Sequence, residues 1–127
     1  MIYSYIKDDL INNFYYQIFN YADWCNCKII PLLKSYCSLE GNAISEEEHC
    51  YFSPEWQDYG LEYFGEEKVL FDFYAPAVDE DKQIIISYQK FYEIVSKYYT
   101  EYANQHLEEK EEIMRLLAEL KKKLNIL

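Results

Sequence analysis

The spacing of the apolar residues changes along this chain from a helical period to a strand period and back. In residues 3–24 apolar side chains recur about every 3.6 residues, which is typical of an amphipathic helix. Residues 68–74 and 83–88 alternate instead and are rich in β-branched and aromatic residues, as strands are. From Ser87 onward the helical spacing returns. This order favours helices packed on an antiparallel hairpin, because a hairpin alone is only marginally stable in water.

Capping signals place the ends of the helices. A second helix is expected at about residues 28–39, with Pro31 in its first turn and Gly41 as its C-terminal stop. Ser87 is expected to cap the next helix, and a last helix follows His106. Glutamates fill the first turn of that last helix and lysines its last turn, which complements the helix dipole. Its leucine stripe is more typical of a face buried in the core than of a dimer interface. A short coiled-coil contact between two copies of the chain is the alternative.

The middle of the chain is less regular. Residues 42–47 are expected to form a polar loop, and residues 49–52 are a candidate third strand. The Ser-Pro-Glu sequence at 53–55 predicts a short helix, and the proline-containing loop at 75–81 is longer than a tight hairpin turn. The predicted fold class is α+β and helix-dominated, in the order α-α-β-β-α-α, with a small antiparallel hairpin or sheet packed on the helices.

Length and composition bound the remaining possibilities. The 127 residues suit a single domain, and an apolar fraction of 50% with 19% aromatic residues excludes a disordered chain. No apolar run reaches the roughly 18 residues that a membrane span needs, and the N-terminus lacks the pattern of a secretory signal. We therefore expect a cytoplasmic protein whose four cysteines remain thiols; these are Cys25, Cys27, Cys37 and Cys50.

The negative charge is concentrated in one part of the sequence. Residues 40–81 contain thirteen acidic residues and a single basic one, Lys68, a net charge of −12, whereas the whole chain carries −11. Such a surface would repel nucleic acid and steer a basic partner toward it. The localisation therefore predicts a protein-binding function, although a merely solvated acidic face is the plainer alternative.

No catalytic or metal site is predicted. The histidines, His49 and His106, belong to no recognisable nucleophile motif, and a hydrolase that uses one of them with a nearby acid is the least favoured hypothesis. The spacing of Cys25 and Cys27, with Cys50 beside His49, fits structural zinc poorly. We expect the cysteines to pack in the core, and we predict no cofactor, no metal and no enzymatic activity.

Two features favour a binding surface. Asp72 lies between strongly apolar neighbours, so it either points outward from the sheet or belongs to a surface that a partner covers. Aromatic residues are interleaved with acids around it, and rigid aromatics ringed by polar groups are typical of interface hot spots, although core packing explains some of them equally well. The predicted binding residues are Asp72, Glu66, Glu67, Asp79, Glu80, Asp81, Trp56, Tyr63 and Tyr74.

Residues 62–124 resemble a known family. The segments GLEYFGEE, IIISYQKFYEIV and EEKEEIMRLLAELKKKL are similar to those of the immunity proteins of contact-dependent growth inhibition, the CdiI or ribonuclease toxin immunity proteins. The likeness is strongest where a strand runs into S-Y-x-x-F-Y, matched here by Ser87, Tyr88, Phe91 and Tyr92. The loop at 75–81 departs from the short link that is usual in the family.

The resemblance implies an antitoxin. Such a protein would bind the C-terminal nuclease domain of a cognate CdiA-type toxin, in a 1:1 complex, and mask its active site without catalysis of its own. Within the family we favour a toxin that resembles EndoU-type RNases, and no direct contact with nucleic acid or membrane. The alternative from the residues themselves is an acidic adaptor that self-associates through the leucine stripe of residues 113–127.

Overall fold

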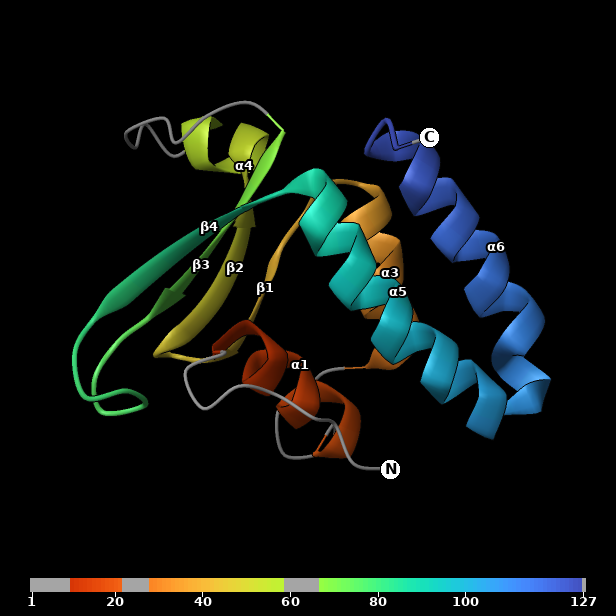
Figure 1. The fold of residues 1–127 in the computed structure, drawn as a ribbon, viewed down its shortest axis with the longest axis horizontal. Helices are drawn as coiled ribbons and strands as arrows, with labels where there is room; N and C mark the ends of the chain where they lie inside the picture. The colour runs from red at the N-terminus through yellow and green to blue at the C-terminus, as the bar shows by residue number, and fades with distance from the viewer. Residues whose placement is uncertain (1–9, 22–27, 59–66, 127) are drawn as a thin grey trace.

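The computed structural model describes residues 10–21, 28–58 and 67–126, with the side chains of 56–58 excepted. It confirms a helix-dominated α+β fold (Figure 1). The described elements are α1 (Leu10–Asn20), α3 (Ile29–Cys37), β1 (Asn42–Ser45), β2 (Glu48–Phe52), α4 (Ser53–Asp58), β3 (Lys68–Phe73), β4 (Lys82–Ser87), α5 (Tyr88–Gln105) and α6 (Leu107–Lys123).

The four strands form one antiparallel sheet in the order β1-β2-β3-β4. β3 and β4 are the predicted hairpin, and β2 is the candidate third strand. The expectation of a polar loop at 42–47 was wrong, because residues 42–45 pair with β2 as an edge strand. This short strand, in which Ile44 is the buried residue, is stabilised by its pairing partner, which the local sequence does not reveal.

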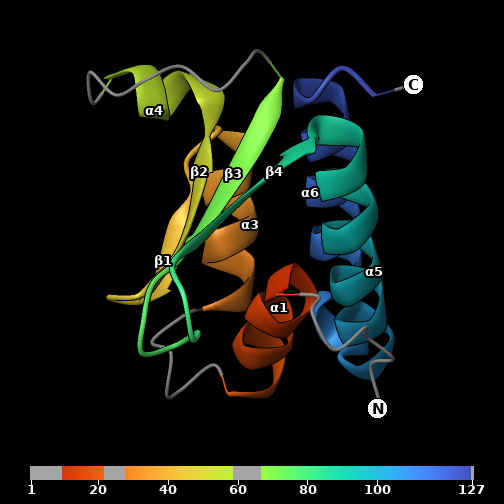
Figure 2. The ribbon, with the colours of Figure 1, turned by 60° about the vertical axis from the view of Figure 1, so that its left-hand side comes forward.

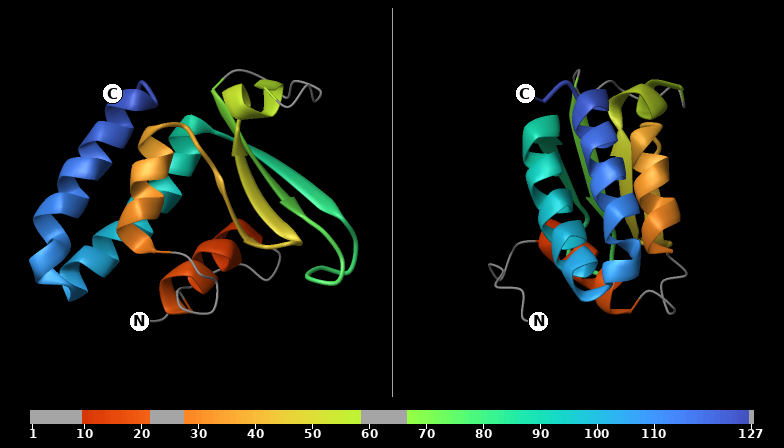
Figure 3. Two further views of the ribbon diagram at one scale, coloured as in Figure 1. Left: turned by 180° about the vertical axis from the view of Figure 1, so that it is seen from behind. Right: turned by 90° about the vertical axis from the view of Figure 1, so that its right-hand side faces the viewer.

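The described helices that pack on the sheet cover one of its faces (Figure 2). α1, α3 and α5 pack on that face, and α6 lies beyond α3 and α5, on the side away from the strands (Figure 3). Aromatic rings fill the space between sheet and helices: Phe14 of α1 meets Phe71 of β3 at a centroid distance of 5.3 Å, edge to face. Among the described residues, no helix crosses the opposite, outer face of the sheet.

The strand pattern sorts side chains between these two faces. On β2, Cys50 and Phe52 point into the core, whereas His49 and Tyr51 stand on the outer face. On β3, Phe71 points into the core. Residues paired directly across neighbouring strands point to the same face of the sheet. The outer face therefore carries His49, Tyr51, Leu70, Asp72, Gln83 and Ile85.

The leucine stripe of α6 belongs to the core of this chain, as the plainer interpretation of the sequence predicted. α6 packs against α3 and α5, and its apolar face is buried between them. The buried members are Ile113, Leu116, Leu117, Leu120 and Leu124. A stripe that already fills the core offers no described surface for the self-association that the adaptor hypothesis required.

Two helix ends can be compared with their predicted signals. Ser87 caps α5 as expected, because its hydroxyl oxygen accepts the backbone N–H of Lys90 at 3.1 Å. Gly41, however, does not stop α3. The helix ends earlier, with Leu39 at a φ of 56° and the N–H of Glu40 bonded to the carbonyl of Ser35 at 3.0 Å, a Schellman arrangement.

Gly41 instead allows a close approach between two backbone segments. A Cβ at this position would overlap the carbonyl group of Cys50 on β2. The Gly41 N–H donates to the Glu55 carboxylate at 2.9 Å, and that carboxylate also accepts the N–H of Phe52 at 2.7 Å. The glycine therefore joins the start of the sheet to α4.

The predicted helix at residues 3–24 is described only in part. Its central turns form α1, and residues 1–9 and 22–27 lie outside the described residues. No helix in the described part of the chain combines the length and the apolar character that a membrane crossing requires.

Candidate functional site

Both hairpin loops of the sheet lie at the same end of the molecule, next to α1 (Figure 1). The backbone N–H of Tyr74, at the end of β3, donates to the carbonyl of Glu47 in the β1–β2 turn at 2.8 Å and so ties the two loops together. The acidic residues of the two loops are thereby gathered. We call this set the acidic end; it consists of Glu46, Glu47, Asp79, Glu80 and Asp81, of which Glu47 is half-buried and the others are exposed.

The structure separates one predicted binding residue from this group. Glu67 precedes β3 at the opposite end of the sheet, where Lys68 pairs with Ser87. The six residues of β3 lie between it and the acidic end, and at about 3.3 Å per residue they span roughly 20 Å. Glu66 and Tyr63 lie outside the described residues, and so does the side chain of Trp56. The described acids among the predicted binding residues are therefore divided between the two ends of the sheet.

Asp81 stabilises the β3–β4 loop in addition to contributing negative charge. Its carboxylate accepts the backbone N–H of Ala75 at 3.0 Å, across the β3–β4 loop. The N–H of Ala77 donates to the carbonyl of Tyr74 at 3.0 Å and closes a turn at the start of the same loop. These bonds set the shape of the loop, while Asp79 and Glu80 remain exposed.

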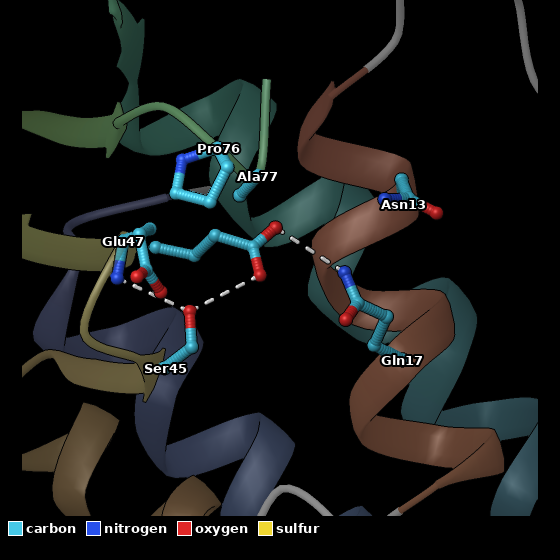
Figure 4. A pocket seen from close by; sticks show the side chains of 7 residues that line it. Asn13, Gln17, Ser45, Glu47, Pro76 and Ala77 are labelled. Carbon is cyan, nitrogen blue, oxygen red and sulfur yellow. Dashed lines mark hydrogen bonds between the residues drawn. The ribbon is translucent and has the colours of Figure 1, made fainter. Parts of the chain in front are cut away.

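A pocket of about 500 Å³ opens between α1 and the two loops (Figure 4). Asn13 and Gln17 line it from α1, and Pro76 and Ala77 line it from the β3–β4 loop. The β1–β2 hairpin supplies the remaining lining residues, which are Ser45, Glu47 and Glu48. The described lining of the pocket thus comes from segments that are distant in sequence.

Glu48 brings a buried carboxylate to this pocket, with 8% of the residue exposed. One carboxylate oxygen accepts the amide of Gln17 at 3.3 Å, and the other accepts the hydroxyl of Ser45 at 3.3 Å. Sequence reasoning missed this residue. The available signal was its phase, because Glu48 alternates with Cys50 and Phe52 and so had to point toward the helices.

The outer face of the sheet carries a second polar cluster beside the acidic end. Asp72 is 2% exposed, and one oxygen of its carboxylate lies 2.9 Å from Nδ1 of His49 on β2. The other oxygen accepts the hydroxyl of Tyr74 at 3.0 Å. Partial burial and this bond to Asp72 raise the pKa of Tyr74 above its ordinary value. Asp72 is therefore a buried support for two side chains and presents no exposed carboxylate.

Apolar surface accompanies this cluster. The Tyr74 ring is 37% exposed and lies edge-on to His49, and Ile85 on the edge strand β4 is 47% exposed. His49 also stacks on Tyr51 at a centroid distance of 5.9 Å. The outer face next to the acidic end thus combines rigid rings with a partly exposed apolar residue, which is the composition of many protein interfaces.

The histidines occupy two different structural settings. His106 lies at the corner between α5 and α6, where its ring stacks on Tyr102 at 3.9 Å and its Nδ1 is 2.9 Å from the carbonyl of Tyr102. His49 pairs with Asp72, but no serine, threonine or cysteine among the described residues is hydrogen-bonded to its ring. The pair of His49 and Asp72 is a histidine with a nearby acid, and the hydrolase hypothesis stays a prediction.

His49 and Cys50 cannot share a metal ion, because adjacent strand residues point to opposite faces and Cys50 is buried in the core. Burial raises the pKa of the Cys50 thiol well above its ordinary value. Cys37 is a free thiol on α3, and Cys25 and Cys27 lie outside the described residues. No group of potential metal ligands occurs among the residues that the structure describes.

Comparison with known proteins assigns the chain to a family. The family model described as CDI immunity protein matches residues 7–117, a span that begins before α1 and ends within α6. It includes the acidic end and all the residues that line the pocket. No curated protein and no solved structure matches the chain. Because the match covers most of the 127 residues, the chain belongs to the family of CDI immunity proteins.

Proposed function

We propose that this immunity protein binds the C-terminal nuclease domain of its cognate CdiA-type toxin through the acidic end and the adjoining outer face. The observation that carries the proposal is the bond between Tyr74 and Glu47, because it holds both acidic loops beside an exposed aromatic ring. Carboxylates on two tied loops make one negatively charged surface, and Tyr74 and Ile85 add apolar area next to it.

An acidic surface of this kind suits a basic cleft. A nuclease must bind the phosphates of its substrate, and lysine and arginine side chains provide most of that binding. A protein that pairs carboxylates with those cations competes with RNA for the same groups and also blocks the cleft sterically. The proposed action is therefore inhibition of an RNase, in the cytoplasm of the producer cell and in a 1:1 complex, without catalysis by the immunity protein.

Asp72 contributes to toxin binding indirectly, by orienting His49 and Tyr74, because its carboxylate is buried and hydrogen-bonded to both side chains. Asp79 and Glu80 are well placed to meet the toxin directly, because they are exposed in the β3–β4 loop. An EndoU-type RNase, which needs no metal ion, is the toxin class that the family resemblance favours.

The test is co-expression with the toxin domain encoded immediately upstream, followed by purification through a tag on this chain. We expect a 1:1 complex that does not cleave RNA, and RNA cleavage after the immunity protein is stripped off. The double variant Asp79→Lys/Glu80→Lys should lose protection. The matched control Glu108→Lys/Glu111→Lys makes the same charge change at exposed positions of α6 and should retain it.

Three outcomes would contradict the proposal in different ways. A chain that purifies alone and leaves the toxin active would refute the choice of partner. A complex that survives the loop variant as well as the control would refute the acidic end as the contact. A bound toxin that cleaves DNA in place of RNA would correct the class of nuclease.

A further inference from the structure

The pocket beside α1 contains a negative charge that the described residues do not balance. Glu48 is the buried acid of this pocket, and its side-chain partners among the described residues are the neutral side chains of Gln17 and Ser45, each at 3.3 Å. Two ion pairs of the described residues, His49 with Asp72 and Arg115 with Glu119, do not involve Glu48. Within the described part of the chain, no Lys, Arg or His nitrogen therefore lies within 4.0 Å of the Glu48 carboxylate, the distance that defines an ion pair.

Such an arrangement is unusual for a carboxylate. Buried charges in proteins are generally paired, because removal from water costs free energy that neutral hydrogen bonds only partly offset. An ionised carboxylate has about four acceptor positions, and Glu48 uses two of them in long bonds. The carboxylate thus keeps acceptor capacity on the side of an open cavity of about 500 Å³.

The surroundings of the pocket also favour a positive occupant. Glu47, a second acid, lines the same wall of the pocket (Figure 4). The two loops that line the pocket also carry the acidic end, which includes Asp79 and Glu80. Among the described residues that line the pocket, none is Lys or Arg.

We propose that this pocket receives one arginine or lysine side chain of the toxin, whose cation pairs with the Glu48 carboxylate in the complex. The inference rests on the proposed function and adds a buried anchor to it. The exposed acids of the loops steer the toxin by long-range attraction, whereas Glu48 holds one basic side chain after docking. The two groups of acids therefore act on different rate constants.

The test uses the complex with the toxin domain encoded upstream and two variants of the pocket. Glu48→Gln removes the charge but keeps an acceptor for Ser45 and a partner for Gln17, so we expect the free protein to fold with a wild-type or higher Tm. Its Kd for the toxin should rise at least about 30-fold, mainly through the dissociation rate, as when one member of a buried charge pair is removed. The exposed control Asp79→Asn makes the same change of charge and should alter mainly the association rate.

The second variant, Ala77→Trp, fills the pocket from the exposed β3–β4 loop and leaves the charge of Glu48 in place. It should also weaken binding at least about 30-fold, because a bulky ring then occupies the space of the basic side chain. Ala118→Trp adds the same ring to the exposed side of α6 and serves as its control, with wild-type affinity expected.

The inference requires both effects. Wild-type affinity in Glu48→Gln, or in Ala77→Trp, would overturn it, because either result would show that the charge or the space of the pocket is not used. These results leave the proposed function intact as long as the wild-type protein binds the toxin. Failure of the wild-type protein to bind would instead refute the proposed function itself.

Discussion

Nδ1 of His49 lies 2.9 Å from a carboxylate oxygen of Asp72, and the two residues face each other directly across β2 and β3. The second oxygen of the same carboxylate accepts the hydroxyl of Tyr74 at 3.0 Å. A single buried carboxylate thus orients two rings on the outer face, one of which is exposed. This links the stability of the sheet to the shape of the proposed interface.

Replacement of Asp72 should therefore affect folding. We expect Asp72→Ala to lower the free energy of unfolding by about 1–3 kcal/mol, because it removes the two hydrogen bonds that this buried carboxylate makes, to His49 and to Tyr74. Urea denaturation measures the effect. Asp72→Asn, which keeps the shape and one acceptor, should cost less, and Glu80→Ala on the exposed loop should stay within about 0.5 kcal/mol of wild type. Equal stability of the Ala and Asn variants would show that these bonds contribute nothing.

Association with the toxin should depend strongly on salt. The rate constant, measured by stopped flow, should fall at least about tenfold as the Debye length shrinks from about 30 Å at 0.01 M to about 3 Å at 1 M salt. Neutralising the loop with Asp79→Asn/Glu80→Gln should flatten this dependence, while Glu108→Gln/Glu111→Gln should not. Rates that are the same at both salt concentrations would rule out electrostatic steering.

Alkaline pH should destabilise the protein. Burial raises the pKa of Tyr15 and of Tyr36 well above the ordinary value of 10.0, and their hydroxyl oxygens lie 2.9 Å apart in the core. The unfolded chain therefore releases these protons first. The stability linked to the two phenols is fully present below pH 10 and is lost as pH rises from there toward the higher folded-state pKa values.

The slope of the free energy of unfolding against pH should approach about 1.4 kcal/mol per pH unit for each buried tyrosine. Urea unfolding at a series of alkaline pH values measures it. Tyr36→Phe removes one titrating group and should make the slope shallower, although it also lowers stability at neutral pH by breaking the bond to Asn42. An unchanged slope would contradict the burial of this hydroxyl. The Cys50 thiol, whose pKa is also raised, contributes equally to both proteins.

Gly41→Ala should be destabilising, because the new Cβ would overlap the backbone of Cys50. Backbone atoms cannot move aside as a flexible side chain can, so we expect a loss of about 1–3 kcal/mol or more. Thermal or urea unfolding gives the value. Ser38→Ala, at the exposed end of α3, is the nearby control and should change stability by less than about 0.5 kcal/mol. Similar values for the two variants would contradict the close approach.

The α6 stripe should determine stability and not oligomeric state. Leu120→Ala should lower the free energy of unfolding by about 2–5 kcal/mol, since Leu120 is fully buried. Met114→Ala, on the exposed side of the same helix, should have a small effect. Sedimentation should give a monomer for the wild-type protein and for both variants. A wild-type dimer that Leu120→Ala dissociates would restore the adaptor hypothesis.

Much of the fold could be predicted from local pattern. The alternation around Leu70 and the 3.6-residue period around Phe91 identified β3, β4, α5 and α6, because side chains return to the same face of a strand or of a helix at these two spacings. β1 was missed because its residues carry no such period. It exists through its pairing with β2.

The candidate site was predictable only in its charge. Summing acids along the sequence located the negative segment, but it also grouped Glu67 with Asp79, which β3 holds at opposite ends of the sheet. The pocket could not be predicted, because the bond between Gln17 and Glu48 joins residues 31 positions apart.

The sequence by itself determined the types of the main elements, the localised negative charge and membership of the CDI immunity protein family. These depend on the period and the identity of residues that are close together in the chain. Only the tertiary structure decided that Asp72 is a buried support, that the α6 stripe lies in the core and that Glu48 lines a pocket. Those roles depend on which distant segments pack together, and the burial of a polar or apolar group is set by all its neighbours at once.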